Sequence, residues 1–161
     1  MVLGNSNARL CYEAAERETP PNRTDIALCN AALGDDGLSL ADAVATHVNR
    51  GILRSRSGDV AGGLADFDRA TSLDPSEPES YLNKGLVLAI KNNQAGKALP
   101  LFGRALELKT KRPELAYFGR AVANEDLGNL RLAYADYRQA VAVAPRWEEA
   151  RAELARFQVR K

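Results

Sequence analysis

The chain of 161 residues has few of the residue types from which metal and cofactor sites are built. It contains one histidine and two cysteines, and its one methionine is the first residue. Three such ligands are too few for a structural zinc site, which needs four. Gly58, Gly62 and Gly63 lack the spacing of a phosphate-binding or dinucleotide-binding loop, and no strand is predicted before them. We therefore expect no metal and no cofactor.

Catalytic motifs are absent from the sequence as well. His47 is the sole histidine, and no arrangement of nucleophile and acid around it has a recognisable motif, so packing or solvent contact is its expected role. Glu125 and Asp126 are adjacent on a predicted helix and therefore point about 100° apart, unlike a catalytic carboxylate pair. The expected role of these two carboxylates is a solvated helix end, and we expect no enzymatic activity.

Long hydrophobic runs and a dominant sign of charge are missing too. The 22 Lys and Arg residues nearly balance the 21 Asp and Glu residues, which leaves a formal net charge of +1. Nothing in this balance draws the whole molecule to nucleic acid or to an anionic membrane, so electrostatic recognition must be local. The short apolar runs exclude membrane insertion. The N-terminus lacks the pattern of a signal peptide, as the chain would after processing.

What the sequence does contain is a unit of about 35 residues that recurs three times. Each copy has two small residues at helical spacing, followed by an aromatic residue and an alanine. The first small site holds Gly51, Gly85 and Ala121, and the later markers are Gly63, Phe67, Ala70 and Leu73, then Ala98, Phe102, Ala105 and Leu108, then Ala133, Tyr137, Ala140 and Val143. Helix backbones approach closely only where side chains are small. The pattern therefore predicts an antiparallel helical hairpin in each copy.

The turns within these hairpins have matching chemistry. Gly58-Asp59, Asn92-Asn93 and Gly128-Asn129 separate the two predicted helices of each copy. Gly and Asn accept the left-handed conformation that ends a helix, and a following Asp or Asn can cap the next helix. The turn residues and the period of the markers agree.

The marker positions resemble those of the tetratricopeptide repeat, from Val44 to Trp147. The resemblance implies an all-α fold, a right-handed superhelical array of antiparallel helix pairs. Departures occur at the fourth position, where His47 replaces an aromatic residue, and at the seventh, where basic residues replace the usual leucine. Those basic residues are Arg50, Lys84 and Arg120, and the second copy has one extra residue in its turn and another after Leu108.

We predict a single domain over residues 1–161. It comprises a degenerate N-terminal hairpin (5–38), repeat 1 (39–77), repeat 2 (78–113), repeat 3 (114–147) and a C-terminal capping helix (148–161). The hairpin is predicted from helices at Asn5–Glu18 and Asn22–Leu33. The capping helix is predicted from an apolar stripe of Trp147, Ala150, Leu154 and Phe157, which can cover the last hairpin.

Two further helix starts are predicted from capping boxes. Ser39 with Asp42 opens a helix that runs to about Ser57, and Ser76 with Glu79 opens one that runs to Lys91.

Cys11 and Cys29 lie in opposite arms of the N-terminal hairpin. If they take the fourth and twenty-fourth positions of the repeat, antiparallel packing places them opposite each other, which allows a disulfide. The alternative is two buried thiols that act as small apolar residues. A bridged pair would indicate a periplasmic or exported protein whose signal has been removed, and free thiols would indicate a cytoplasmic one.

The resemblance also implies where a ligand would bind, because the first helix of each tetratricopeptide hairpin lines the concave face. The predicted peptide-binding residues of this face are Val48, Asn49, Ile52, Leu82, Asn83, Leu86, Phe118 and Val122. An asparagine amide can satisfy both a backbone N–H and a C=O of a bound segment. Leu82, Leu115 and Phe118 stand where a carboxylate clamp for chaperone C-termini would need charge, so that ligand class is not expected.

The predicted function is a non-catalytic scaffold or adaptor that binds a protein or peptide segment in the concave groove. The alternative for the groove is that neighbouring helices occlude its apolar row. The alternative for the function is a structural or self-associating subunit that uses outer or terminal surfaces. The expected state is a monomer or a weak homo-oligomer, with no nucleic-acid partner.

Overall fold

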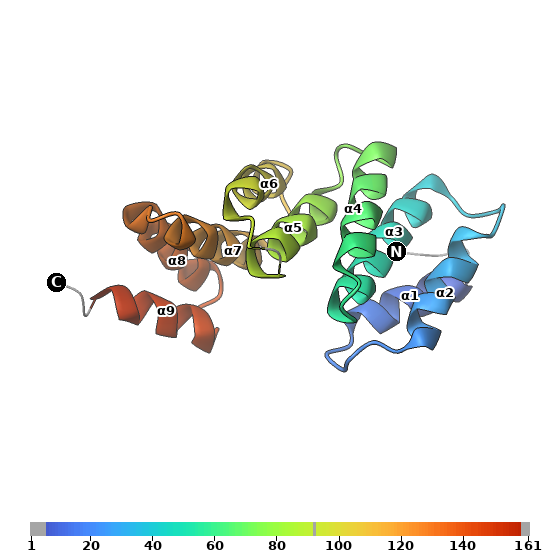
Figure 1. The fold of residues 1–161 in the computed structure, drawn as a ribbon, viewed down its shortest axis with the longest axis horizontal. Helices are drawn as coiled ribbons and strands as arrows, with labels where there is room; N and C mark the ends of the chain where they lie inside the picture. The colour runs from blue at the N-terminus through green and yellow to red at the C-terminus, as the bar shows by residue number, and fades with distance from the viewer. Residues whose placement is uncertain (1–5, 92, 159–161) are drawn as a thin grey trace. The chain divides into compact units, whose positions relative to one another are not determined.

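A computed structural model describes residues 6–91 and 93–158, which form helices joined by turns (Figure 1). The all-α prediction is confirmed for these residues. None of the described helices is both long and apolar enough to span a membrane. The helices are α1 (Ser6–Glu16), α2 (Arg23–Leu33), α3 (Leu40–Arg56), α4 (Val60–Leu73), α5 (Pro78–Leu86), a π-helical turn η1 (Val87–Lys91), α6 (Ala95–Glu107), α7 (Pro113–Asp126), α8 (Leu130–Val143) and α9 (Glu148–Gln158).

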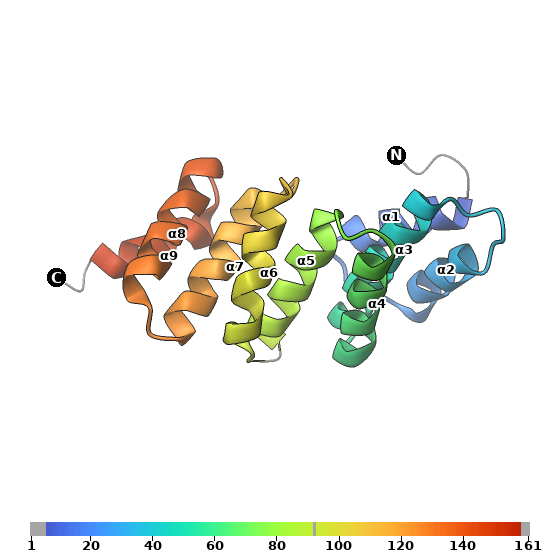
Figure 2. The same cartoon turned by 90° about the horizontal axis from the view of Figure 1, so that it is seen from above.

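The chain divides into two compact units, which we call the first unit (Met1–Asn83) and the second unit (Lys84–Lys161). In the first unit α3 packs antiparallel on α4, and both α1 and α2 pack on α3 (Figure 1). In the second unit α7 lies between α6 and α8, and α9 packs on α8 (Figure 2). The prediction of one domain, with its repeat boundaries, stays a prediction.

The helix starts of the first unit follow from local hydrogen bonds. Asn22 and Asp25 form a full capping box at the start of α2. At the start of α3 the hydroxyl of Ser39 accepts a hydrogen bond from the Asp42 backbone N–H at 3.1 Å, which is the Ser39 half of the predicted capping box. Gly58 then ends the hairpin's first arm with a φ of +95°, the left-handed conformation expected from its sequence.

The predicted capping box of Ser76 with Glu79 is wrong. The Ser76 hydroxyl donates to Asp74 Oδ1 at 2.6 Å instead, within the turn that precedes α5. The Glu79 N–H donates to the side chain of Glu77 at 3.0 Å, and the helix begins at Pro78. Proline suits the first helical position because its missing N–H has no partner there in any helix. The start signal of α5 was therefore the proline.

The extra residue of the second copy is accommodated by the π-helical turn η1. One inserted residue widens a helical turn from the i→i−4 to the i→i−5 pattern, which keeps the flanking helices in register. Asn93 follows with a φ of +48°, and the Gln94 N–H donates to the Leu88 carbonyl at 2.8 Å. The insertion therefore changes the turn, while η1 packs on both α6 and α7.

The small residues of the repeat admit aromatic rings, as predicted. A Cβ placed on Gly51 would lie 2.6 Å from the ring of Phe67, and one placed on Gly85 would lie 2.9 Å from the ring of Phe102. Both rings are fully buried. A Cβ on Gly119 would also meet Phe102, at 2.5 Å. This ring therefore explains why the third copy has glycine at the sixth position, where the earlier copies have asparagine.

Apolar side chains of the C-terminal helix pack on the hairpin of α7 and α8. Ala150 is fully buried, and Leu154 and Phe157 pack against the cluster of Ala121, Ala133 and Tyr137. The ring of Trp147 lies 4.7 Å from that of Phe118. Apolar side chains of α9 thus cover the last hairpin of the second unit.

Candidate functional site

The N-terminal hairpin is closed by a disulfide between Cys11 and Cys29. Their Cα atoms are 4.9 Å apart, and both residues are fully buried. Ala14, Ala15 and Leu53 complete the cluster around the bridge, so α3 contributes to it. This pairing is the one that the repeat positions allowed. The bridge is part of a core and presents no reactive thiol.

A second contact fixes the hairpin to α3. The guanidinium of Arg56 donates to the backbone carbonyls of Ala15 at 2.9 Å and Thr19 at 3.2 Å, at the end of α1. Arg17 forms an ion pair with Asp25 between the two arms of the hairpin. The Arg56 guanidinium thus stabilises the end of α1, and the ion pair of Arg17 with Asp25 joins the two arms of the hairpin.

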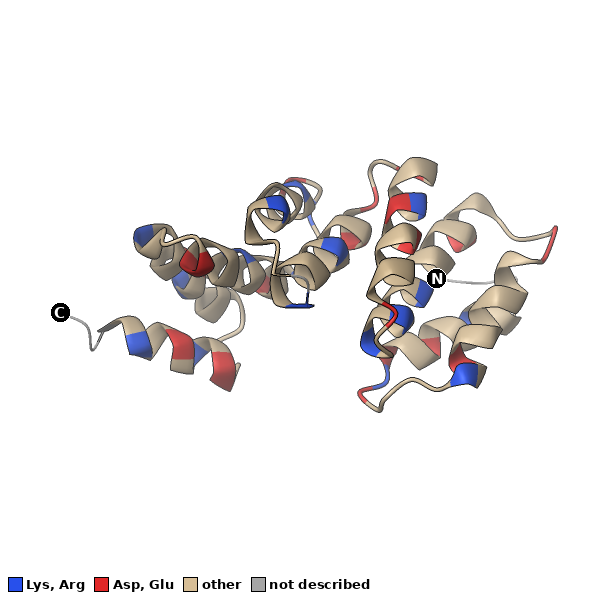
Figure 3. Ribbon diagram, in the orientation of Figure 1, with Lys and Arg blue, Asp and Glu red and all other residues tan. Residues whose placement is uncertain are grey.

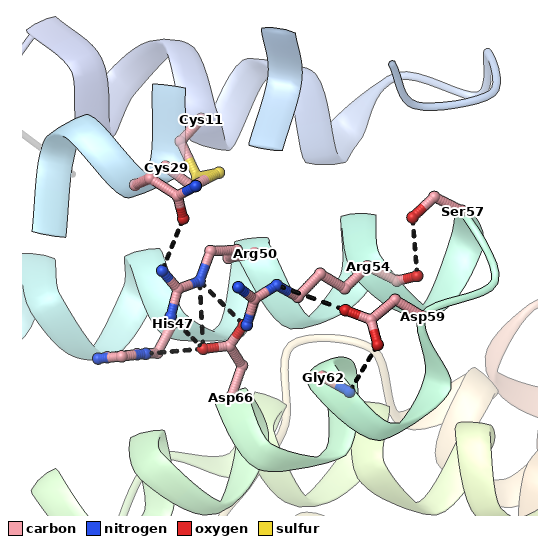
Figure 4. A network of polar contacts seen from close by, with 10 residues as sticks. Cys11, Cys29, His47, Arg50, Arg54, Ser57, Asp59, Gly62 and Asp66 are labelled. Carbon is pink, nitrogen blue, oxygen red and sulfur yellow. Dashed lines mark hydrogen bonds and ion pairs between the residues drawn. A yellow bond between two sulfur atoms is a disulfide. The ribbon is translucent and has the colours of Figure 1, made fainter. Parts of the chain in front are cut away.

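The carboxylate of Asp66 is the centre of the polar network in the first unit (Figure 4). Its side chain is only 3% exposed, and it accepts hydrogen bonds from Arg50 at 2.7 Å and Arg54 at 2.9 Å. His47 Nδ1 lies 3.0 Å from the same carboxylate, and Arg50 reaches on to Asn30 of α2 at 2.8 Å. The network therefore joins α2, α3 and α4.

The pKa of the Asp66 carboxyl follows from these partners. Burial raises the pKa, but the hydrogen bonds from His47 and Arg50 and the charges of Arg50 and Arg54 outweigh burial. The net result is a pKa below the ordinary value of 3.8. Asp66 is thus ionised at neutral pH and balances the arginines, which is a structural role.

The same pair recurs in the second unit. Arg120 donates to both oxygens of Asp136, at 2.7 and 2.8 Å. Arg50 and Arg120 are the seventh-position residues that depart from the repeat's usual leucine. Each arginine replaces leucine in a copy that also has an Asp directly before its aromatic residue, and the arginine pairs with that Asp. The second copy has Lys84 and Leu101 at the corresponding positions.

Two candidates for chemistry in the sequence have structural roles. His47 lies against Asp66, and no nucleophile joins them among the contacts of the described residues. Glu125, expected as a solvated helix end, instead accepts hydrogen bonds from Tyr137 at 3.1 Å and from Arg156 at 2.6 Å. It therefore links α7, α8 and α9, whereas Asp126 is exposed as expected. The described residues contain no cluster of three potential metal ligands.

Three of the eight predicted peptide-binding residues are buried. Val48 packs with Val44 and Ala70 in the core between α3 and α4, and Asn49 and Leu82 are also buried. The expected apolar row is thus partly occluded in the first unit. Buried side chains cannot present pockets to a ligand without movement of their neighbours.

The other five residues are partly exposed. Ile52 contacts the same core as Val48. Phe118 and Val122 pack against the core of the second unit, where Phe118 also meets the rings of Tyr137 and Trp147. Asn83 and Leu86 lie three residues apart on α5 and so share one of its faces.

The amide of Asn83 is the predicted polar contact that remains accessible. Its Nδ2 donates to the Glu79 carbonyl one turn earlier, at 2.8 Å. This bond fixes the orientation of the side chain and leaves the carbonyl oxygen to accept from a ligand. Asn83 therefore presents an oriented amide oxygen on the same face of α5 as the partly exposed Leu86.

Comparisons with known proteins agree with this architecture. Residues 115–146 match the family model of the tetratricopeptide repeat. No curated protein matches the sequence. The fold is similar to that of PilW, described as a widely conserved type IV pilus biogenesis factor, with a TM-score of 0.81 and 20% identity over 97% of this chain and 70% of that chain. It is also similar to a MamA RS-1 ArsTM double mutant, with a TM-score of 0.72 and 20% identity over 97% of this chain and 85% of that chain.

Proposed function

Because this chain folds as a tetratricopeptide-repeat protein, we propose that it is a non-catalytic scaffold that binds a segment of another protein. The fold implies interaction between proteins, and the charged side chains of the interior support the absence of catalysis. Asp66, Asp136 and His47 are each occupied in contacts between helices. Their role is to hold the array together.

The observation that carries the proposal is the face of α5 formed by Asn83 and Leu86. Asn83 provides an oriented carbonyl oxygen that can accept from a backbone N–H of the bound segment. Leu86 is partly exposed and provides an apolar contact beside it. Backbone recognition with adjacent apolar contact suits a segment with alternating apolar residues.

The test is binding by an Asn83→Ala, Leu86→Ala double variant to a partner captured from the source cells and purified. We expect the dissociation constant to rise at least tenfold, because an oriented hydrogen bond and an apolar contact are both lost, each worth about 1 kcal/mol or more. Arg69→Ala, Ser72→Ala on the exposed side of α4 is the control and should bind normally. Thermal unfolding monitors the fold of each variant.

Leu86 also packs near Gly119 and Phe102, so its truncation can lower stability. The single Asn83→Ala variant removes only an amide from a partly exposed position and keeps the test valid if the double variant unfolds. Unchanged affinity of a folded Asn83→Ala variant and of a folded double variant would remove this face from the site.

A further inference from the structure

The near-neutral chain is divided into an acidic and a basic half. The first unit contains 7 Lys and Arg and 13 Asp and Glu residues, a formal charge of −6, whereas the second contains 15 and 8, a formal charge of +7. The boundary between the signs coincides with the boundary between the compact units. The formal net charge of +1 for the whole chain does not show this division, because the charges of the two units nearly cancel.

Most of the arginines of the first unit are paired within the unit, which leaves its exposed charges mainly acidic. Arg17, Arg50, Arg54 and Arg56 all make contacts within the unit, to carboxylates or to backbone carbonyls. Four of its seven basic residues are therefore committed to the fold, whereas Glu13, Glu16 and Glu18 are exposed. Figure 3 shows the acidic and basic residues along each unit.

The outward face of α1 combines acidic and apolar side chains. Tyr12 is 47% exposed and shares its side of the helix with Glu16 at i+4, whereas Leu10, 38% exposed, points about 160° away from Tyr12. Glu13 is exposed on the same side as Tyr12 and Glu16, and Arg9 pairs with Glu13 at 3.9 Å. We call this surface the α1 face.

The outward face of α8 has the opposite charge beside a stripe of exposed apolar side chains. Leu132 is 58% exposed and Val143 is 46% exposed, and Arg131 and Arg138 are exposed on the same helix. Residues 132, 135, 139 and 143 follow one stripe at helical spacing. The corresponding stripe of α4 is less apolar, with Gly62, Ala65 and Arg69 at the positions of Leu132, Ala135 and Gln139, and the partly exposed Leu73 at that of Val143. We call this surface the α8 face.

We propose that the α1 face of one copy of this chain docks on the α8 face of a second copy. A second copy of this chain is the expected occupant, because the same sequence carries an acidic and a basic surface, each with exposed apolar side chains beside its charges. The contact is heterologous, so each dimer leaves one free α1 face and one free α8 face, and further copies can add. This self-association goes beyond the scaffold role and does not use Asn83 or Leu86.

A contact between two helix faces is at the small end of protein interfaces, so the association is weak and sensitive to salt. Sedimentation velocity of the wild-type chain should give a sedimentation coefficient that rises with protein concentration at about 0.1 M salt. The rise should disappear towards about 1 M salt, where the Debye length falls from about 10 Å to about 3 Å. A wild-type chain that stays monomeric at low salt and high concentration overturns the proposal.

Two variants test the two faces separately. The α8 variant, Arg131→Glu with Arg138→Glu, retains the acidic α1 face. The α1 variant, Tyr12→Ser with Glu13→Gln and Glu16→Gln, retains the basic α8 face. Each should be monomeric alone, and an equimolar mixture should form one-to-one dimers and nothing larger, because only one productive pair of faces remains. A mixture that stays monomeric overturns the proposal.

A third variant controls for total charge. Lys97→Glu with Lys109→Glu changes the charge of the second unit as much as the α8 variant does, but at exposed positions outside the α8 face. It should self-associate like the wild type. Association lost equally in this variant would show a dependence on net charge and would overturn the assignment to α8. Binding of polyglutamate to the α8 face by a strictly monomeric wild-type chain would favour a different acidic partner and would also overturn it.

Discussion

The guanidinium of Arg50 in α3 lies 2.7 Å from the carboxylate of Asp66 in α4, and both side chains are largely withdrawn from solvent. The Nε of Arg50 also contacts both carboxylate oxygens, at 3.0 and 3.2 Å, so the pair has the geometry in which arginine binds a carboxylate best. Burying two charges has a large desolvation penalty, which such geometry offsets only when both partners are present. The stability of the first unit should therefore depend on each member.

We predict that Asp66→Asn lowers the free energy of unfolding by about 3 kcal/mol, because Arg50, Arg54 and His47 lose their shared anion. Asp136→Asn should have a smaller effect, because one arginine, itself 30% exposed, pairs with that carboxylate. Urea denaturation followed by circular dichroism measures both. Equal and small losses, below about 0.5 kcal/mol, would match exposed ion pairs and contradict this role for Asp66.

The lowered pKa of Asp66 predicts how stability depends on pH. A carboxyl whose pKa is lower in the folded than in the unfolded state contributes stability that is fully present above its ordinary pKa of 3.8. That contribution is lost as the pH falls below about 4 and through the lower folded pKa. The wild type should therefore lose more stability between about pH 5 and pH 2 than Asp66→Asn does. Parallel pH profiles would contradict the prediction.

The repeat markers predicted the fold because they report packing, which depends on the size of individual side chains. The period placed Phe67 beside the small site of Gly51, and the repeat positions allowed a bridge of Cys11 with Cys29 but left two buried thiols as the alternative. The ion pair of Arg50 with Asp66 was missed, although the sequence held a signal for it. Arg at the seventh position occurs with Asp before the aromatic residue in the first and third copies, and both are absent in the second.

The candidate site was less predictable than the fold. Asn49 and Asn83 have the same repeat position, but Asn49 is buried and Asn83 is partly exposed. The repeat position of a residue predicts the direction of its side chain, but it does not predict whether neighbouring residues bury that side chain. The role of Glu125 was also missed, because its partner Arg156 lies 31 residues away and outside the repeat.

Glycines of the array should differ in their tolerance of a methyl group. In Gly51→Ala the new Cβ would overlap the buried ring of Phe67, and overpacking of this kind costs about 1 to 3 kcal/mol. In Gly103→Ala, on α6, nothing lies within 4 Å of the new Cβ. The gain in helix propensity should then raise stability by up to about 1 kcal/mol. Melting temperatures that shift in the same direction for both would contradict the packing described for Gly51.

Lys109 ends α6 in the left-handed region, with a φ of +60°. Its N–H donates to the Leu106 carbonyl at 3.0 Å and the next N–H, of Thr110, donates to Ala105 at 2.9 Å, the hydrogen bonds of a Schellman motif. The glycines at the equivalent ends of α3 and α7 have no Cβ to strain. Lys109→Gly should therefore stabilise the chain by about 1 kcal/mol.

Lys97→Gly, in the first turn of the same helix, is the matched control and should destabilise by up to about 1 kcal/mol. Chemical denaturation of the two variants measures the difference. A Lys109→Gly variant less stable than the wild type would mean that the lysine side chain makes a contact worth more than its backbone strain.

The disulfide of Cys11 with Cys29 should stabilise the first unit by about 3 kcal/mol, because it closes a short loop in the unfolded chain. The Cys11→Ala, Cys29→Ala variant should lose this amount, and the loss should be largest for α1 and α2, as measured by hydrogen exchange. Since both sulfurs are buried, reductant should act on the folded wild type only as fast as the hairpin opens.

A thiol count on unreduced protein, made before and after unfolding, checks the bridge itself. No reactive thiol should be found in either case, and two thiols after unfolding would contradict the bond. A bridge that forms in the source cells requires an oxidising compartment, since the cytosol keeps such pairs reduced. The same count on protein isolated without reductant from those cells therefore decides between the exported and the cytoplasmic location, because the buried pair cannot re-oxidise without opening.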